Sequence, residues 1–250
     1  MLNQPAFWIA AIPAVVMIGL SKGGLGPLGG LAVPILSLVI SPVQAAGLTL
    51  PIFVLSDVVA VIAYRRSFEP GLLKVMLPAA VLGVGLGWLT AAQVSDDAVR
   101  LIVGVVSTVF ALNYWLRGRF VSDALKPSTP KGAAWGAVAG YTSFVSHSGG
   151  APFQMYVLPL GLTPLAFAGT STIFFASVNV MKLVPYYFLG QLKLTNLTAT
   201  AILTPLSIIC ALAAVRLVKV IDQRSFYRMI YVLMFLIGAW LIGQAAVDMI

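Results

Sequence analysis

Eight apolar stretches occupy nearly the whole chain, and they limit what it can fold into. They cover about residues 6–40, 43–64, 71–92, 98–116, 133–162, 164–189, 195–215 and 227–247. A helix needs about 20 mainly apolar residues to cross the hydrocarbon core of a bilayer. Most of these stretches are therefore long enough to cross once, and the sequence predicts an all-α integral membrane protein.

The composition supports this prediction and narrows the range of partners. Hydrophobic residues make up 60% of the chain and charged residues 9%, whereas a soluble domain carries roughly 25% charged residues. The net charge of +8 lies mostly between the apolar stretches, where Lys and Arg orient a membrane protein. We therefore expect one membrane domain over residues 1–250, surrounded by lipid, and no nucleic-acid partner.

A glycine-rich break interrupts the first stretch and recurs in the fifth. Residues 21–27 read Ser-Lys-Gly-Gly-Leu-Gly-Pro, and residues 146–152 read Ser-His-Ser-Gly-Gly-Ala-Pro, 125 positions later. This recurrence predicts an internal duplication, with repeat 1 over about residues 6–118 and repeat 2 over about 132–248. At a spacing of 122, further pairs are Pro42 with Pro164, Gly47 with Gly169, Phe53 with Phe175, Asp57 with Asn179, and Tyr64 with Tyr186.

The breaks divide these two stretches into halves of about a dozen residues, each too short to span a bilayer alone. Each broken stretch is therefore either a broken span or a re-entrant hairpin that returns to the side it entered. Basic residues distinguish the two because they concentrate in short cytoplasmic loops. Hairpins place eleven Lys and Arg residues on one side and two on the other, whereas full crossings give eight and five. We therefore expect two inverted repeats, each a hairpin plus three transmembrane helices, with both termini on the non-cytoplasmic side.

The two breaks are candidates for a binding site. Backbone groups that lack helical partners are tolerated inside a membrane only where protein, water or a ligand satisfies them, and paired interruptions indicate a transport site. A helix that begins near Gly26 or Gly150 turns its first N–H groups toward the break, which suits an oxyanion. The candidate residues in the breaks are Ser21, Lys22, Gly23, Gly24, Gly26, Ser146, His147, Ser148, Gly149 and Gly150.

Lys22 and His147 occupy equivalent positions in the two breaks. Lys22 supplies a positive charge, and an unperturbed histidine, with a pKa of about 6.5, can exchange a proton in the physiological range. The alternative is that Lys22 extends to the membrane interface and His147 is structural. The cost of burying ionisable groups in a membrane favours a functional role. The amide of Gln154 is a further candidate for hydrogen bonding to the anion.

Asp57 lies in the second stretch, and its counterpart Asn179 lies in the sixth, one helical turn before Lys182. Lys182 is a candidate for anion binding, while Asp57, His147 and Asn179 are candidates for proton coupling or charge pairing. The alternative is a structural ion pair of Asp57 with Lys182 or Lys22. The functional and the structural role are compatible if an anion displaces the carboxylate from the lysine. Four hydroxyl residues are further candidates for the cavity lining: Thr49, Thr170, Ser171 and Thr172. The alternative is that they only pack or hydrogen-bond between helices.

Several of these features resemble the sulfite exporter TauE/SafE family, also called the 4-toluene sulfonate uptake permeases. They are the opening glycine-rich break, the Ser-Pro followed by Ala-Ala-Gly-Leu-Thr-Leu-Pro over residues 41–51, Asp57 within an apolar stretch, and the tandem halves. The resemblance covers essentially the whole chain. It implies transport of sulfite, sulfonates such as sulfoacetate, or related organosulfur anions across the bacterial inner membrane. A thiosulfate-importing relative uses paired cysteines, whereas this chain has only Cys210.

The leading hypothesis is a secondary transporter for a small anionic substrate, more an exporter than an importer, that works by alternating access with proton coupling through His147 or Asp57. We expect no enzyme activity, catalytic residue, cofactor or metal, because no nucleophile setting or metal-ligand spacing is present. A passive anion channel and, with less support, a membrane-embedded enzyme are the alternatives. The sequence leaves a homodimer open.

Overall fold

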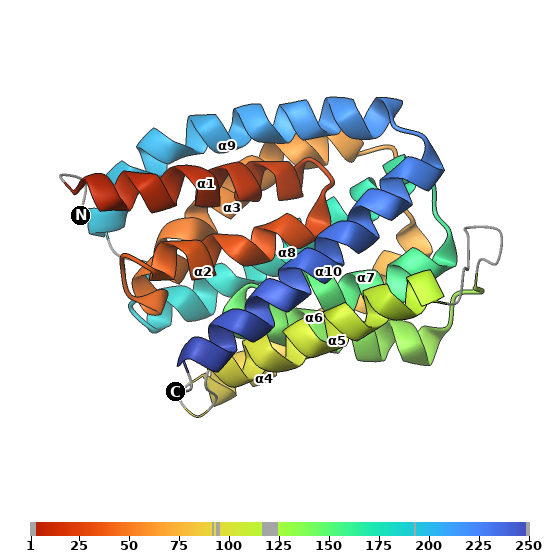
Figure 1. The fold of residues 1–250 in the computed structure, drawn as a ribbon, viewed down its shortest axis with the longest axis horizontal. Helices are drawn as coiled ribbons and strands as arrows, with labels where there is room; N and C mark the ends of the chain where they lie inside the picture. The colour runs from red at the N-terminus through yellow and green to blue at the C-terminus, as the bar shows by residue number, and fades with distance from the viewer. Residues whose placement is uncertain (1–3, 92, 94–95, 117–124, 193, 249–250) are drawn as a thin grey trace.

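The computed structural model describes residues 4–91, 93, 96–116, 125–192 and 194–248, and within them every regular element is a helix (Figure 1). The first broken stretch forms α1, η1 and α2, and the second forms α6, α7 and η3. In chain order the elements are α1 (Pro5–Lys22), η1 (Gly26–Leu31), α2 (Ala32–Ser37), α3 (Pro42–Tyr64), α4 (Pro70–Thr90), α5 (Asp96–Leu116), α6 (Thr129–Ser146), α7 (Gly150–Val157), η3 (Leu158–Leu160), α8 (Pro164–Phe188), α9 (Leu194–Val220) and α10 (Gln223–Asp248).

The helices that follow the two broken stretches begin in the same way. The hydroxyl of Ser41 accepts a hydrogen bond from the Gln44 N–H at 3.3 Å, and the hydroxyl of Thr163 accepts one from the Ala166 N–H at 3.2 Å. A proline occupies the first turn of both helices, where its missing N–H has no helical partner to lose. α3 and α8 therefore start at equivalent positions of the two predicted repeats.

The lengths of the broken helices differ from the expectation. Pieces of about a dozen residues were expected, but α1 and α6 have 18 residues each. α6 extends into the polar connection because Pro130 is well suited to the first turn of a helix. Within the described part of the chain, six helices are long and apolar enough to cross a membrane: α1, α3, α4, α8, and the parts Asn196–Val220 of α9 and Gln223–Ala246 of α10. The apolar part of α5, Leu101–Leu116, is shorter.

The two broken stretches meet at their tips. A β-carbon built on Gly150 would lie 3.2 Å from the carbonyl oxygen of Gly26, and one on Gly30 would lie 3.7 Å from the carbonyl oxygen of His147. In Figure 1 both termini lie at the left-hand end of the bundle, and α2 runs back toward this end, whereas the α9–α10 connection lies at the right-hand end. The first hairpin thus enters from the end that holds the termini.

Basic residues gather toward the other end of the bundle. Arg65 and Arg66 follow α3, while Lys219 and Arg224 flank the α9–α10 connection. This placement agrees with the charge asymmetry expected for two hairpins. The face of the membrane that each end occupies, and the inverted symmetry of the repeats, stay predictions. Three of the basic residues used in that count lie outside the described residues: Arg117, Arg119 and Lys193.

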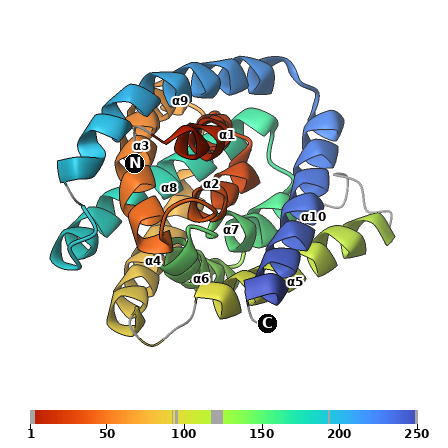
Figure 2. The same ribbon diagram turned by 60° about the vertical axis from the view of Figure 1, so that its left-hand side comes forward.

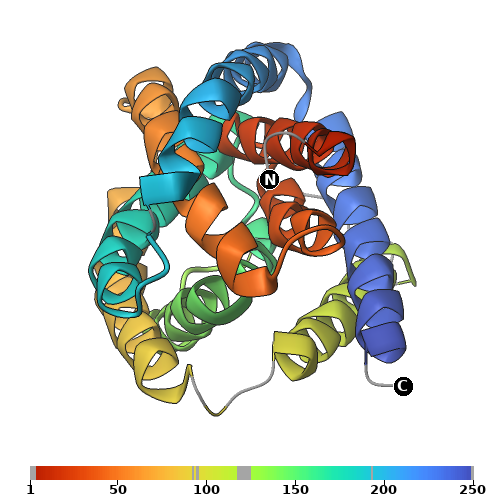
Figure 3. The ribbon, with the colours of Figure 1, turned by 90° about the vertical axis from the view of Figure 1, so that its left-hand side faces the viewer.

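The first helix of each predicted repeat packs against a long helix of the other repeat. α1 lies along α9, and α6 lies along α4 (Figures 2 and 3). Between membrane helices the lipid provides no hydrophobic drive, so small residues that allow close backbone approach are favoured. A β-carbon on Gly19 of α1 would collide with the Ser207 carbonyl of α9, and one on Gly83 of α4 would collide with the Ala137 carbonyl of α6.

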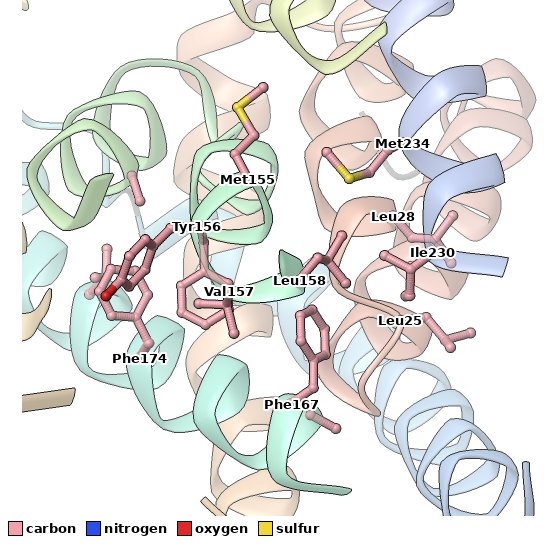
Figure 4. Packing of buried hydrophobic residues seen from close by; sticks show 14 of the residues in the cluster. Leu25, Leu28, Met155, Tyr156, Val157, Leu158, Phe167, Phe174, Ile230 and Met234 are labelled. Carbon is pink, nitrogen blue, oxygen red and sulfur yellow. The ribbon is translucent and has the colours of Figure 1, made fainter. Parts of the chain in front are cut away.

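The second arms of the hairpins are buried in the middle of the bundle. Leu25 and Leu28 of the first hairpin pack in one apolar cluster with Leu158 of the second. Figure 4 shows this cluster closed on one side by Phe167 and Phe174 of α8 and on the other by Ile230 and Met234 of α10. Because apolar side chains fill this region, the polar groups of the hairpins gather at the tips, where the breaks lie.

Candidate functional site

A small cavity lies at the hairpin tips. The centre of a water-sized molecule can move within a volume of about 40 Å³ in this cavity. On the same measure, one buried water needs roughly 10–15 Å³. The cavity thus has room for a few waters or one small anion. Its lining comes from both hairpins, α3 and α8: Ser21, Lys22, Gly26, Gly29, Gly30, Phe53, Ser143, His147, Gly150, Ser171, Thr172, Phe175 and Asn179.

Lys22 forms a buried ion pair beside the cavity. Its Nζ lies 2.7 Å from Oδ1 of Asp57, and both side chains are 5% exposed. Oδ2 of the same carboxylate accepts a hydrogen bond from Nδ2 of Asn179 at 2.7 Å. Nζ also lies 4.9 Å from the ring centroid of Phe53, within the range of a cation–π contact. The end of α1 is therefore tied to α3, and through the carboxylate to α8.

His147 belongs to a second buried network. Nζ of Lys182 donates to the Ser143 carbonyl at 2.7 Å and lies 3.2 Å from Nδ1 of His147. With Lys182 protonated, its ammonium group has only donors, so Nδ1 is the acceptor and the imidazole is neutral. Its proton is therefore assigned to Nε2, which lies 2.9 Å from the hydroxyl of Tyr186. That hydroxyl donates in turn to the Phe144 carbonyl at 3.3 Å.

The backbone at each break makes a turn that a regular helix cannot make. His147 has φ 55°, in the left-handed region, and its N–H bonds to the Ser143 carbonyl at the end of α6. Gly24 has φ 115°, where a side chain would be strained. These turns end α1 and α6 at the cavity, which Lys22 and His147 both line.

Gln154 of α7 is a buried amide at the contact between the tips. It is fully buried, and neither of its polar atoms has a hydrogen-bond partner among the described residues. Its Nε2 lies 2.6 Å from the position of a β-carbon on Gly26 and 3.8 Å from that on Gly150. An unsatisfied buried polar group costs about 1–3 kcal/mol, so this amide is available for a ligand that reaches the tips.

Other predicted residues in the breaks bond within their own hairpin. The Ser21 hydroxyl donates to the Gly26 carbonyl at 3.0 Å. Ser146 donates to the Thr142 carbonyl and Ser148 to the Ser146 carbonyl. The remaining glycines serve packing: Gly23 faces α9, Gly24 faces Ala168 and Tyr64, and Gly149 faces Ala139 of α6.

The four candidate hydroxyl residues divide into two groups. Ser171 and Thr172 line the cavity, and the Thr172 hydroxyl donates to the Lys22 carbonyl at 3.5 Å. Thr49 instead donates to the Ala46 carbonyl of its own helix. Thr170 accepts a hydrogen bond from the Glu69 N–H and donates to the Ala166 carbonyl, so it joins α8 to the α3–α4 connection. Thr49 and Thr170 are not brought to the cavity.

Three aromatic residues at the site were not among the sequence candidates. Phe53 and Phe175 line the cavity, and the Phe53 ring stacks on His147 with centroids 5.5 Å apart and an interplanar angle of 15°. Tyr186 holds the imidazole from its other side. Phe53 with Phe175 and Tyr64 with Tyr186 are pairs at the 122-residue spacing, and that spacing was the signal that could have identified them.

A second, smaller cavity lies next to the first and is apolar. It offers about 20 Å³ to the centre of a water-sized molecule and shares Gly30 and Gly150 with the polar cavity. Its lining comes from the tips, α5 and α10: Pro27, Gly30, Val103, Ser107, Ser148, Gly150, Ala151, Met234, Ile237 and Leu241. The two tip glycines therefore separate a cationic space from an apolar one.

The charged groups at the site suit an anion. With both lysines protonated, Lys22, Lys182 and Asp57 leave one positive charge in excess, and among the described residues the ion pair in this cluster joins Lys22 to Asp57. Lys182 contacts neutral acceptors and the ring of Tyr186. A small anion in the cavity would balance this charge and meet hydroxyl and amide groups around it.

Comparison with known proteins gives one match. The sequence model of a family described as Sulfite exporter TauE/SafE matches residues 11–241, a range that includes both breaks and every candidate residue of the site. No curated protein and no solved structure matches the chain.

Proposed function

Because the chain belongs to the sulfite exporter TauE/SafE family, we propose that it is a secondary transporter of a small sulfur oxyanion or organosulfonate in the bacterial inner membrane. The observation that carries this proposal is the cavity between the hairpin tips, lined by Lys22 and His147. Family membership supports transport of this class of anion. The cavity supplies the place where such an anion is held.

The anion binds at the tips, in contact with groups from both hairpins. Lys22 offers its ammonium group, and Ser171 and Thr172 offer hydroxyl groups on the α8 side of the cavity. The N–H groups at the start of α7 face the tip, and its positive dipole end favours a negative charge there. The unpartnered amide of Gln154 adds a hydrogen-bond donor beside this point.

Asp57 competes with the anion for Lys22. Its carboxylate lies 2.7 Å from the ammonium group, and the incoming anion takes this place. The displaced carboxylate keeps its hydrogen bond to Asn179 and is the group that accepts a coupling proton, with His147 as the second candidate. This exchange leaves Lys22 paired with a negative charge in both states, whereas an unpaired buried ammonium group would be costly.

The apolar cavity beyond Gly30 and Gly150 bears on the size of the substrate. A simple alkyl or aryl sulfonate carries its charge at one end and an apolar carbon skeleton at the other. Its sulfonate group fits the cationic cavity, and a short carbon skeleton fits toward Met234 and Ile237. This neighbourhood favours an organosulfonate of a few carbon atoms over bare sulfite as the preferred substrate.

The geometry gives little support to an enzyme. The Nε2 of His147 is engaged with Tyr186 and its Nδ1 with Lys182. The Ser148 hydroxyl donates to the carbonyl of Ser146. A serine nucleophile needs a hydrogen bond to its base, and neither of these groups is placed for one. Transport by alternating access, most simply export, is the function we propose.

The first experiment is a thermal-shift panel on the purified protein with sulfite, thiosulfate, sulfate, sulfoacetate and taurine. A ligand that binds only the folded state raises the melting temperature by mass action. We expect sulfite or sulfoacetate to raise it in the parent protein, and Lys22→Ala, His147→Ala and Lys182→Ala to weaken that response. Exposed Lys219→Ala is the matched control and keeps the full response.

Flux measurements in proteoliposomes then identify the transport class. A transporter gives saturable counterflow of labelled sulfite or sulfoacetate, whereas a channel gives conductance without exchange and an enzyme converts its ligand. Flux that is insensitive to an imposed pH gradient would remove proton coupling. An equal thermal response of the parent and all three site variants would show that the site lies elsewhere.

A further inference from the structure

Two tyrosines reach the two breaks from equivalent positions. Tyr64 is the last residue of α3 and Tyr186 lies in the last turn of α8, 122 residues later. The Tyr64 hydroxyl donates to the Gly23 carbonyl at 2.6 Å. The Tyr186 hydroxyl lies 2.9 Å from Nε2 of His147. Both side chains are buried, with 0% and 2% exposure.

The breaks need such partners because of where they lie. The last carbonyl groups of a helix have no partner within that helix, and the membrane interior provides no bulk water to replace one. Tyr64 satisfies the Gly23 carbonyl directly after α1. Tyr186 satisfies the Phe144 carbonyl in the last turn of α6. Each tyrosine thus serves the broken helix of its own predicted repeat.

We propose that Tyr64 and Tyr186 are paired positioning residues that hold the two breaks, and with them Lys22 and His147, against α3 and α8. Tyr64 acts through the backbone, since Gly23 directly follows Lys22. Tyr186 acts through the imidazole and through the backbone of α6. The role of this pair in transport rests on the proposed function, whereas its effect on the positions of the breaks does not.

The two tyrosines act on different groups, which makes the proposal testable residue by residue. Nε2 of His147 carries its proton toward Tyr186, so Nδ1 is left to accept from Lys182. Removing the Tyr186 hydroxyl takes away the acceptor of the Nε2 proton, while Lys182 still donates to Nδ1. Removing the Tyr64 hydroxyl leaves the imidazole untouched and frees only the backbone at Gly23, because its hydrogen bond goes to the Gly23 carbonyl.

The state of the imidazole can be read directly, because His147 is the single histidine of the chain. Protein labelled with ¹⁵N-histidine and purified with a histidine-free tag gives one pair of ring nitrogen signals in nanodiscs. We expect the parent to show the tautomer protonated at Nε2, and Tyr186→Phe to keep this tautomer with a shifted Nε2 signal, because its N–H has lost its acceptor. Tyr64→Phe keeps the parent signals. The control is Tyr227→Phe, which removes a buried hydroxyl that donates to the Leu162 carbonyl at 2.9 Å, outside the cavity lining.

Hydrogen exchange reads the effect on the first break. In Tyr64→Phe we expect exchange in the peptide over residues 19–31 to rise by roughly 3- to 10-fold, as the loss of one buried hydrogen bond implies. Tyr227→Phe leaves that peptide unchanged. The proposal is overturned if Tyr186→Phe keeps the parent Nε2 signal, or if Tyr64→Phe exchanges in this peptide no faster than Tyr227→Phe.

Counterflow of labelled sulfite separates this proposal from the proposed function. Parent protein without sulfite or sulfoacetate flux contradicts the transport proposal, while the imidazole and exchange results still decide the role of the tyrosines. With an active parent, we expect both site variants to slow counterflow and Tyr227→Phe to keep the parent rate. Parent rates in Tyr64→Phe and Tyr186→Phe contradict a positioning role in transport.

Discussion

Replacing Asp57 by Asn tests the ion pair at the centre of the site. The change keeps the size of the side chain and removes its charge, which leaves the Lys22 ammonium buried without a carboxylate. At the observed 2.7 Å, the Coulomb attraction is about 6 kcal/mol for an effective dielectric constant of about 20. Breaking a buried pair typically costs about 3–5 kcal/mol. At about 2–4 °C per kcal/mol for a chain of this length, the melting temperature should fall by roughly 6–20 °C.

The same variant should respond more strongly to the anion. If the anion takes the place of the carboxylate, the variant presents Lys22 with no competitor, and the anion binds more tightly than in the parent. A tenfold gain in affinity adds about 1.4 kcal/mol of stabilisation at saturating anion. The rise in melting temperature caused by sulfite or sulfoacetate should therefore be larger in Asp57→Asn than in the parent.

The assay is thermal unfolding in detergent, followed by intrinsic fluorescence, with chloride at equal ionic strength as the reference. The matched control is the double variant Asp57→Asn/Asn179→Asp, which moves the carboxylate across the 2.7 Å hydrogen bond between the two residues and keeps the net charge. Its stability and anion response should return toward those of the parent. The competition between Asp57 and the anion would be refuted if Asp57→Asn is as stable as the parent. It would also be refuted if the anion raises the melting temperature of Asp57→Asn no more than that of the parent.

Three further variants probe the breaks, the packing and the surface. Gly26→Ala should reduce the sulfite-induced rise in melting temperature, because the new β-carbon meets the Gln154 amide at 2.6 Å, whereas Gly85→Ala, with open space around it, should keep that rise. Gly83→Ala should lower the melting temperature without changing the anion response. The new β-carbon overpacks the contact between α4 and α6, which should lower the free energy of unfolding by about 1–3 kcal/mol. At the start of α10 the Ser225 N–H donates to Asp222 and lowers the pKa of that carboxyl. Its ionised form therefore stabilises the fold above the ordinary pKa of about 3.9, and this contribution is lost as the pH falls through the lower folded value. The melting temperatures of Asp222→Asn and the parent should accordingly converge as the solution is acidified, and a constant difference would contradict this.

The placement of the two breaks could be predicted because glycine and proline act locally. The helices that follow them begin at Gly26 and Gly150, the positions where the sequence expects second short helices. The common cavity of Lys22 and His147 was a prediction from the duplication alone, and both residues line it. The length of α6 was not predictable from hydropathy, because its first turn is polar and is started by Pro130.

The pairing of charges could not be predicted from the sequence. Asp57 had two candidate partners, and the choice depends on how α8 is rotated against α3 and α6. In the structure Asn179 faces the carboxylate while Lys182, about one turn later, faces Ser143 and His147. The serines of the second break were candidates for the anion, but short hydroxyl side chains readily bond to their own backbone, as Ser146 and Ser148 do.

The crossed packing of the broken helices has a consequence for biosynthesis. When the first 116 residues have left the ribosome, α1 has no α9 and α4 has no α6, so the glycine faces of both helices lack the surfaces that they fit. Neither half can complete its own interior. The nascent chain must therefore wait, partly assembled in the bilayer, until its final helices are inserted and interleave with the earliest ones.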